Sequence, residues 1–185
     1  MSAEFNYQNN YILNKGLSSD SLFIFSIKNV IMKVGDFMKK IFKVINSEQT
    51  IELGKRIGEK LDCGDVVLLI GDLSAGKTTI TKGIGLGLGI KKVINSPTFT
   101  IVKVYSGRCP LYHLDLYRLD GINNDFDLEE YIEGDGVCVI EWPYQVSEIL
   151  PDEYIKITLE RTGDITRDII VEAVGDRYDS VIEVL

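Results

Sequence analysis

The sequence predicts an α/β fold, a three-layer domain built around a mainly parallel central sheet. Two apolar runs, residues 66–70 and 137–140, lack the alternation of a strand with one wet face, so they suit strands buried on both faces. Segments with helical periodicity alternate with strand-like runs along the chain, as in parallel α/β sheets. A Gly-rich turn joins the first run to the helix that follows it, at the edge of the sheet where such folds bind ligands.

The first strand is expected over residues 41–45, opened by Met38-Lys39-Lys40. A helix should follow to about residue 61, because Asn46-Ser47 can cap it and Glu48 lies in its first turn. Apolar and small residues share one face of this helix, which favours close packing against a neighbour; they are Ile51, Gly54, Ile57, Gly58 and Leu61.

The remaining elements follow in the same way. A second helix should run to about residue 88 after the Gly-rich loop. Two short strands, a short helix and the second buried strand come next, over residues 101–105, 111–116, 126–132 and 137–140. Residues 154–159 and 168–173 flank a polar turn at Thr162-Gly163-Asp164, so they predict a C-terminal β-hairpin.

Length and charge restrict the class of function. A chain of 185 residues accommodates one domain with a short appendage, and its net charge is −8. An acidic chain repels phosphate backbones, so direct binding of nucleic acid is not expected, although a role on RNA through a partner is compatible. No apolar run approaches the roughly 20 residues that a membrane helix needs.

The cysteines predict no crosslink. The sequence has an odd number of cysteines, Cys63, Cys109 and Cys138, and no two of them form a C-x-x-C pair. Neither a disulfide framework nor a zinc site is therefore indicated. Isolated, buried thiols in a reducing cytosol are therefore expected.

Residues 1–37 differ from the rest of the chain, and residues 38–185 are taken as the functional domain. The first part is polar, carries balanced charge and has an apolar run at 21–27 without the flanks of a secretory signal. Gly35-Asp36 can be encoded by a ribosome-binding sequence, so the hypothesis is that translation naturally starts at Met38. A short ordered or dimerising extension is the alternative.

A nucleotide-binding motif follows the first buried strand. Gly71-Asp72-Leu73-Ser74-Ala75-Gly76-Lys77-Thr78 matches G-x-x-x-x-G-K-[ST] in full, which predicts a phosphate loop of a P-loop NTPase-like domain. Backbone N–H groups would face the phosphates, Lys77 would reach the β- and γ-phosphates, and the Thr78 hydroxyl would bind Mg²⁺. Thr79 could contact the α-phosphate. No N-K-x-D element follows, so ATP is favoured over GTP.

Two acids could complete a Mg²⁺-nucleotide site. Asp115 and Glu141 each end a strand-like run, and the carboxyl ends of parallel strands form the ligand edge of the sheet. The alternative for either is a solvated acid at a strand end. Ser96, Thr98 and Thr100 offer hydroxyls where such folds carry a γ-phosphate switch, or else they form an ordinary turn at a strand start.

Two residues that occur once each have open roles. His113 lies in an alternating strand pattern, which favours packing on a strand face over a general base. Trp142 follows Glu141 directly, where it could shield the nucleotide or simply pack.

The order of these motifs resembles one family. The phosphate loop, Ser96-Pro97-Thr98-Phe99-Thr100, residues 112–119 (YHLDLYRL) and Ile140-Glu141-Trp142-Pro143 occur as in the TsaE family of bacterial tRNA threonylcarbamoyladenosine biosynthesis ATPases. The resemblance spans about residues 41–173. It implies a small cytoplasmic, Mg²⁺-dependent ATPase, monomeric when free. It also implies that ATP resets a TsaB–TsaD partner complex, which modifies the adenosine beside the anticodon of ANN-decoding tRNAs, so that tRNA is met only indirectly.

The resemblance also implies roles for single residues. Lys77, Asp115 and Glu141 would be catalytic, with Asp115 orienting water, and Thr78 and Glu141 would hold Mg²⁺. ATP would be bound by Leu73, Ser74, Ala75, Gly76, Lys77, Thr78, Thr79, Trp142 and, more weakly, Ser47 and Arg167. Ser96, Thr98 and Thr100 would form the switch. Many family members have Gly where this chain has Ser74.

Two rival functions remain open at this stage. A small-molecule P-loop kinase usually closes an Arg-bearing lid over the γ-phosphate, and the arginines of this chain are not clustered. A pure binding module, in which ATP switches partner affinity, would differ by releasing no phosphate. For an ATPase, Arg118 or a partner could supply the missing arginine finger.

Overall fold

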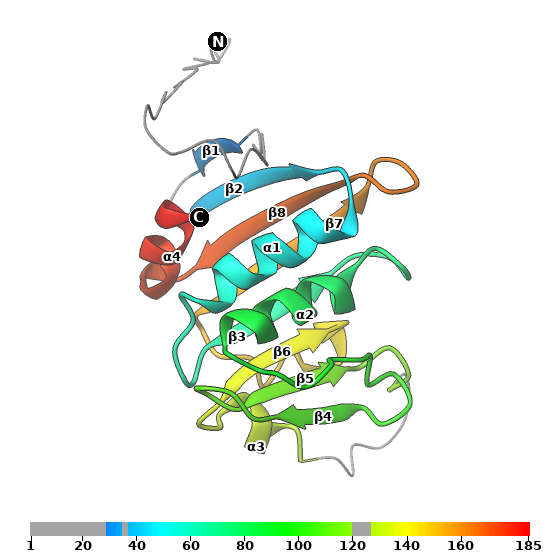
Figure 1. Ribbon diagram of the computed structural model, residues 1–185. Coiled ribbons are helices and arrows are strands. Elements are labelled where there is room, and N and C mark those ends of the chain that lie inside the picture. The colour runs from blue at the N-terminus through cyan, green and yellow to red at the C-terminus, as the bar shows by residue number, and fades with distance from the viewer. Residues whose placement is uncertain (1–28, 35–36, 120–126) are drawn as a thin grey trace.

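A single mixed sheet organises the chain, and it is seen in a computed structural model that describes residues 29–34, 37–119 and 127–185. Within those residues the sheet has eight strands in the order β1-β2-β8-β7-β3-β6-β5-β4 (Figure 1). In that order the strands are Asn29–Val34, Phe37–Val44, Arg167–Val174, Tyr154–Arg161, Val66–Ile70, Val137–Glu141, Leu111–Asp115 and Val102–Tyr105.

The centre of the sheet is parallel and its flanks are antiparallel. β3 pairs in parallel with β7 and β6, and β6 pairs in parallel with β5. β4 joins β5 in an antiparallel pair, and β7 and β8 form the C-terminal hairpin. β2 extends the other side antiparallel to β8, and β1 pairs with β2 at the edge. The predicted α/β class, parallel centre and hairpin are confirmed.

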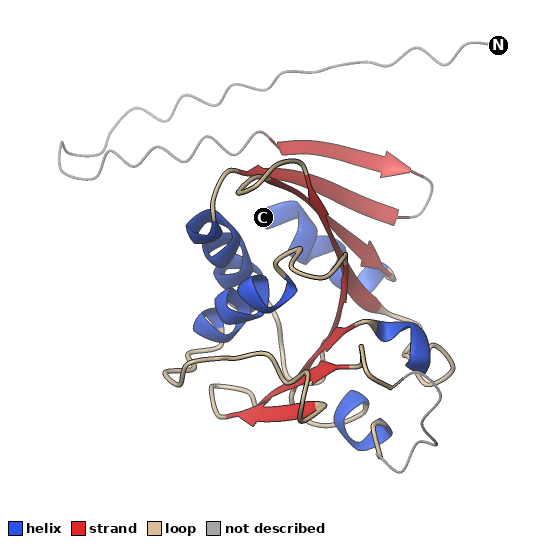
Figure 2. Cartoon of the chain, turned by 90° about the vertical axis from the view of Figure 1, so that its right-hand side faces the viewer, coloured by secondary structure: helices blue, strands red, loops and turns tan. Residues whose placement is uncertain are grey.

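Helices and short turns cover the two faces unequally. α1 (Ser47–Gly58) and α2 (Lys77–Gly87) lie side by side on one face (Figures 1 and 2). The opposite face carries α3 (Glu129–Ile132) and the 3₁₀ turn η1 (Pro143–Val146). The 3₁₀ turn η2 (Asp176–Tyr178) leads into the C-terminal α4 (Asp179–Val184), which packs against β2 and β8. The short helix predicted over 126–132 begins only at Glu129, and residue 126 lies outside the described residues.

The core lies on both faces of the central strands, as the continuous apolar runs predict. Along β3 and β6, one set of side chains packs under α1 and α2, including Val67, Leu69 and Val139. The alternate set, including Leu68 and Ile140, packs under α3 and η1. This two-sided burial explains why these strands lack a polar face.

Glycines allow α1 and α2 to touch backbone to backbone. A Cβ atom on Gly54 would lie 2.3 Å from the carbonyl oxygen of Ile80. On Gly83 it would lie 2.1 Å from the carbonyl oxygen of Ile51. The predicted small-residue face of the first helix is therefore its contact with the phosphate-loop helix. Its cap is also as expected, since the Asn46 side chain accepts a hydrogen bond from the backbone N–H of Gln49.

The expectation of isolated cysteines is wrong for two of the three. Cys63 and Cys109 form a disulfide with their Cα atoms 5.5 Å apart. The residues are 46 positions apart in sequence, in the turns before β3 and between β4 and β5, and only the fold brings these turns together. Cys138 is a free, buried thiol, and burial raises its pKa. None of the described helices has the length and apolar character required to span a bilayer.

Candidate nucleotide site

The site lies at the edge of the sheet where the parallel strands end. β3 leads into the phosphate loop (residues 71–78), β5 ends at Asp115 and β6 ends at Glu141. Asp115 and Glu141 are directly paired across β5 and β6, so their side chains project on the same face, the one covered by α2. The fold therefore brings together the motif and both predicted acids, which are separated by up to 70 residues in sequence.

These residues surround one cavity of about 280 Å³, called the first cavity below. Most of the predicted nucleotide and switch residues line it. The lining residues are Leu73, Ser74, Gly76, Lys77, Thr78, Thr79, Ser96, Thr98, Asp115, Tyr117, Glu141 and Trp142.

The phosphate loop contains backbone conformations that favour glycine. Gly76 has φ +113° and caps the N-terminus of α2. Gly71 has φ +149°, and a Cβ atom there would lie 2.6 Å from the carbonyl oxygen of Leu159. Ser74 also has a positive φ, +63°, which is the left-handed region that costs a non-glycine residue about 1 kcal/mol or more. The glycine that the family resemblance implies at this position fits that conformation without strain.

Lys77 folds back over its own loop. Its Nζ donates hydrogen bonds to the carbonyl oxygens of Gly71, at 2.6 Å, and Asp72, at 2.9 Å. The same ammonium lies 4.2 Å from the ring centroid of Trp142, a cation–π distance. Burial lowers the pKa of Lys77, and the negative charges of Glu141 and Asp115 oppose that shift. A buried cation is thus held at the cavity by neutral acceptors.

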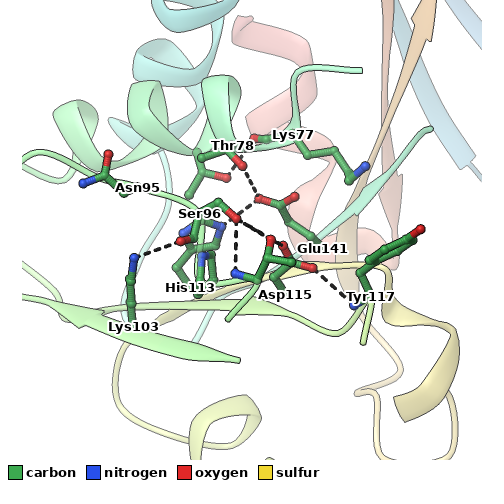
Figure 3. Close-up of polar contacts among 12 residues, drawn as sticks. Lys77, Thr78, Asn95, Ser96, Lys103, His113, Asp115, Tyr117 and Glu141 are labelled. Carbon is green, nitrogen blue, oxygen red and sulfur yellow. Dashed lines mark hydrogen bonds and ion pairs between the residues drawn. The ribbon is translucent and has the colours of Figure 1, made fainter. Parts of the chain in front are cut away.

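Thr78 and Glu141 form the oxygen pair that a magnesium ion would need. The Thr78 Oγ1 donates to Oε1 of Glu141 at 2.9 Å, and the Glu141 carboxylate is only 3% exposed (Figure 3). Hydroxyl and carboxylate oxygens are ligands that Mg²⁺ prefers. Within the described residues no group of three or more His, Cys, Asp or Glu side chains could hold a metal.

Asp115 is bound by the switch segment (Ser96–Thr100) rather than by solvent. The Thr98 hydroxyl donates to Oδ2 of Asp115, the Ser96 hydroxyl donates to the same oxygen at 3.3 Å, and the Tyr117 N–H donates to Oδ1 at 3.2 Å. Asp115 is 4% exposed, so the alternative of a solvated strand-end acid does not describe it.

Thr100 stands apart from the other two hydroxyls of the segment. Its hydroxyl donates to the carbonyl oxygen of Pro97 at 3.3 Å, as in an ordinary turn, and Thr100 does not line the first cavity.

Two aromatic residues close one side of the first cavity. The rings of Trp142 and Tyr117 have centroids 5.0 Å apart, and both residues line the cavity. Trp142 has φ +60°, a strained conformation for a bulky residue that typically marks a functional site. Trp142 both lines the cavity and packs against the apolar cluster under α3 and η1, so its two predicted roles both remain open. The sequence did not assign Tyr117 to the site, although it lies two residues after Asp115 in the turn that follows β5.

A second cavity of about 320 Å³ lies on the other side of the phosphate loop. Ser47 and Arg167, predicted to approach the base or ribose, both line it together with Ala75. The Arg167 Nε donates to the Ala75 carbonyl oxygen at 2.9 Å, so the hairpin is tied to the loop. Gly76 and Thr79 line both cavities, so the two lie on either side of the N-terminus of α2. The second cavity is also lined by five residues to which the sequence assigned no role in a site, namely Asn46, Glu48, Thr50, Asp164 and Ile165.

Two further residues have contacts that the sequence did not predict, although the buried strand-face position favoured for His113 is confirmed. Arg118, considered as an arginine finger, places its guanidinium 4.3 Å from the Phe99 ring and lines neither cavity. His113 is fully buried beneath the site, with Nε2 2.9 Å from Oε1 of Glu141. Its spacing of two residues from Asp115 is the sequence signal that could have placed it on the face of the site.

Comparisons with known proteins agree with this geometry. Residues 44–169 match the family model described as "Threonylcarbamoyl adenosine biosynthesis protein TsaE". The chain is 46% identical over 150 residues to a Bacillus subtilis (strain 168) protein named "tRNA threonylcarbamoyladenosine biosynthesis protein TsaE", covering 80% of this chain and 95% of that protein. A Treponema pallidum (strain Nichols) protein of the same name is 45% identical over 128 residues, covering 68% and 95%.

A solved structure gives the same result for the fold. The structure titled "Crystal structure of Bacillus subtilus YdiB" superposes with a TM-score of 0.71 at 40% sequence identity, covering 81% of this chain and 95% of that one. The match to the family model runs from the last residue of β2 to the third residue of β8. It includes all residues that line the two cavities, with Asp115 and Glu141 among them. By its family match and by these relatives, the chain belongs to the TsaE family.

Proposed function

We propose that this protein is a Mg²⁺-dependent ATPase that serves threonylcarbamoylation of tRNA without performing the transfer. In this proposal it acts as a monomer on a TsaB–TsaD partner complex. ATP binding and hydrolysis reset that complex between modifications of the adenosine beside the anticodon in ANN-decoding tRNAs. Contact with tRNA is indirect, in keeping with the net charge of −8.

One observation carries the nucleotide part of the proposal. Lys77, Thr78, Asp115 and Glu141 converge on the first cavity, and the second cavity continues past the same helix N-terminus toward Ser47. Triphosphate groups suit the first cavity, because backbone N–H groups and a buried ammonium favour anions there. The base and ribose of ATP suit the second cavity, where Arg167 and Ser47 offer polar contacts.

The chemistry follows from the side chains already described. Lys77 would leave the carbonyl oxygens of Gly71 and Asp72 and bind the β- and γ-phosphate oxygens. When bound by Thr78 and Glu141, Mg²⁺ would neutralise charge on the same oxygens. Asp115 would orient the attacking water, after its bonds to Thr98 and Ser96 rearrange.

A partner is expected to accelerate this reaction. No described arginine lines the first cavity, and Arg118 is engaged with the Phe99 ring. An arginine that neutralises the transition state raises the rate of related enzymes by about 10³-fold or more. We therefore expect slow hydrolysis by the chain alone and faster turnover with TsaB–TsaD. The same lack of a cavity-lining arginine among the described residues gives the rival kinase no support.

The test is phosphate release from Mg²⁺-ATP, measured for the chain alone, with TsaB–TsaD, and with both TsaB–TsaD and tRNA. Equal rates with and without the partner would contradict the resetting role, and no phosphate release at saturating partner would favour a binding module. The same assay on a chain that begins at Met38 asks whether residues 1–37 contribute.

Variants separate the roles within the site. Lys77→Ala should abolish nucleotide binding, and Glu141→Ala should mainly weaken Mg²⁺-dependent hydrolysis. Lys82→Ala is the matched control, because Lys82 is an exposed lysine of the same helix and should retain activity. Normal hydrolysis by the first two variants would refute the site.

A further inference from the structure

The histidine of this chain lies under the site rather than in a purely apolar core. His113, the only one in the sequence, is on β5, two residues before Asp115, so both side chains project on the face covered by α2. In the register of the sheet His113 is opposite Val139 and therefore diagonal to Glu141. The side chain is completely buried.

The His113 side chain forms its hydrogen bond with Glu141. The His113 Nε2 lies 2.9 Å from Oε1 of Glu141, and the Thr78 hydroxyl donates to that same oxygen at 2.9 Å (Figure 3). A carboxylate only accepts hydrogen bonds, so Nε2 carries the hydrogen. Among the described residues Nδ1 has no hydrogen-bond partner, although it is buried. Within the part of the chain that the structure describes, the polar contact of the imidazole is therefore with Glu141.

A histidine kept only for packing would be replaced at little cost by an apolar side chain, which leaves no buried nitrogen unpaired. From these contacts we propose that His113 is a positioning residue for Glu141, an inference that rests on the Mg²⁺-nucleotide function proposed above. Two donors, Nε2–H of His113 and the hydroxyl of Thr78, fix Oε1. Oε2 accepts no hydrogen bond from the described residues, so it stays available to the cation or its water.

The physical reason is the freedom of a glutamate side chain. Glu141 has three rotatable bonds, and a single hydrogen bond from Thr78 to Oε1 leaves the carboxylate free to turn about that contact, so a second donor to the same oxygen restricts it further. Partners that orient a metal ligand typically contribute about 10–100-fold to metal affinity. His113 should therefore affect Mg²⁺ binding much more than it affects nucleotide binding without the metal.

Two substitutions at His113 distinguish the loss of its hydrogen-bond donor from a change in side-chain size. His113→Met keeps an apolar side chain of similar size without a donor, and His113→Gln carries an amide N–H at about the reach of Nε2. Tyr178→Phe is the control, because it removes a buried hydroxyl that donates to Asp65 at 3.1 Å, near the opposite end of β3. It should cost stability without touching the site.

The first measurement is a Mg²⁺ titration at saturating ADP. The fluorescence of Trp142, the only tryptophan in the sequence, reports binding. We expect His113→Met to lower the Mg²⁺ affinity about tenfold or more, and His113→Gln to stay within about threefold of the unmodified chain. ADP affinity in EDTA should change less than about twofold in either variant. Unchanged Mg²⁺ affinity in His113→Met, or an equal loss in Tyr178→Phe, would overturn the inference.

The second measurement needs neither metal nor nucleotide. A single histidine gives one pair of imidazole nitrogen signals by NMR, so the protonated nitrogen can be read directly. We expect the Nε2–H form, with an Nε2 signal that moves in Glu141→Ala and stays in place in Lys82→Ala. An Nδ1–H form, or a signal indifferent to Glu141→Ala, would contradict the proposal, even if His113→Met did not fold. If the unmodified chain binds no nucleotide but gives the expected NMR result, the proposed function fails while the His113–Glu141 contact stands.

Discussion

The contact between α1 and α2 makes a sharp prediction, because both cavities depend on it. α2 begins at the phosphate loop, and the first turn of α1 supplies Ser47 and Thr50 to the second cavity. Gly83 of α2 lies directly against the backbone of α1 at Ile51. Replacing Gly83 by Ala should therefore separate the helices, destabilise the fold and weaken nucleotide binding together.

The magnitude follows from the geometry. The new Cβ would lie 2.1 Å from the Ile51 carbonyl oxygen, whereas ordinary contacts are 3.4–4 Å, so the backbones must part by about 1 Å. Overpacking by one carbon costs about 1–3 kcal/mol, and the upper end applies because a backbone cannot rotate away. Ala gains about 1 kcal/mol of helix propensity over Gly. The net loss is about 2 kcal/mol, or about 4–8 °C in the melting temperature of a chain this size.

Gly85→Ala is the matched control in the same helix. A Cβ there would meet Cδ1 of Ile94, the movable end of a flexible side chain, so the gain in helix propensity should offset most of the cost. The assay is a thermal melt of each variant followed by titration with ATP. Equal melting temperatures for Gly83→Ala and Gly85→Ala would refute the argument that backbone contact sets the helix spacing.

Three other predictions concern the loop, the crosslink and the second cavity. Ser74→Gly should raise the free energy of unfolding by up to about 1 kcal/mol, because φ +63° strains serine, and a lower melting temperature would contradict this. Reducing the disulfide between Cys63 and Cys109 should lower the free energy of unfolding by roughly 4 kcal/mol for a loop of this length, and the urea midpoint should fall with it. An equal urea midpoint with and without reductant would argue against the crosslink. Arg167→Ala should weaken ATP binding about fivefold, the equivalent of one hydrogen bond, and unchanged affinity would assign Arg167 to the loop alone.

Local patterns were sufficient to predict the central fold. The apolar run of β3 and the phosphate-loop sequence each specify local structure, so their strand and helix could be placed almost to the residue. The first helix ends at Gly58 rather than near residue 61, because helix ends depend on caps and on packing with neighbours. The C-terminal hairpin was predicted, but the pairing of β2 with β8 could not be read in advance, because it joins strands far apart in the sequence.

The site, like the fold, contains residues that local sequence predicted and contacts that only the fold created. Lys77, Thr78 and Glu141 were predicted from motif and strand ends, and the structure brings them to one cavity. The sequence favoured packing for His113, because its spacing from Asp115 indicates a shared strand face but not that Glu141 lies on the neighbouring strand. The start-site hypothesis for residues 1–37 stays a prediction, with 29–34 forming β1 in the structure.

By itself the sequence determined the class of fold and the position of the phosphate-loop motif, because both arise from residues close together in the chain. Tertiary structure decided which distant residues became neighbours. It joined Cys63 to Cys109, laid α1 against α2 through their glycines, bound Asp115 to the switch segment and placed His113 under Glu141. Each of these contacts depends on strand order and register, which arise from packing the whole core at once.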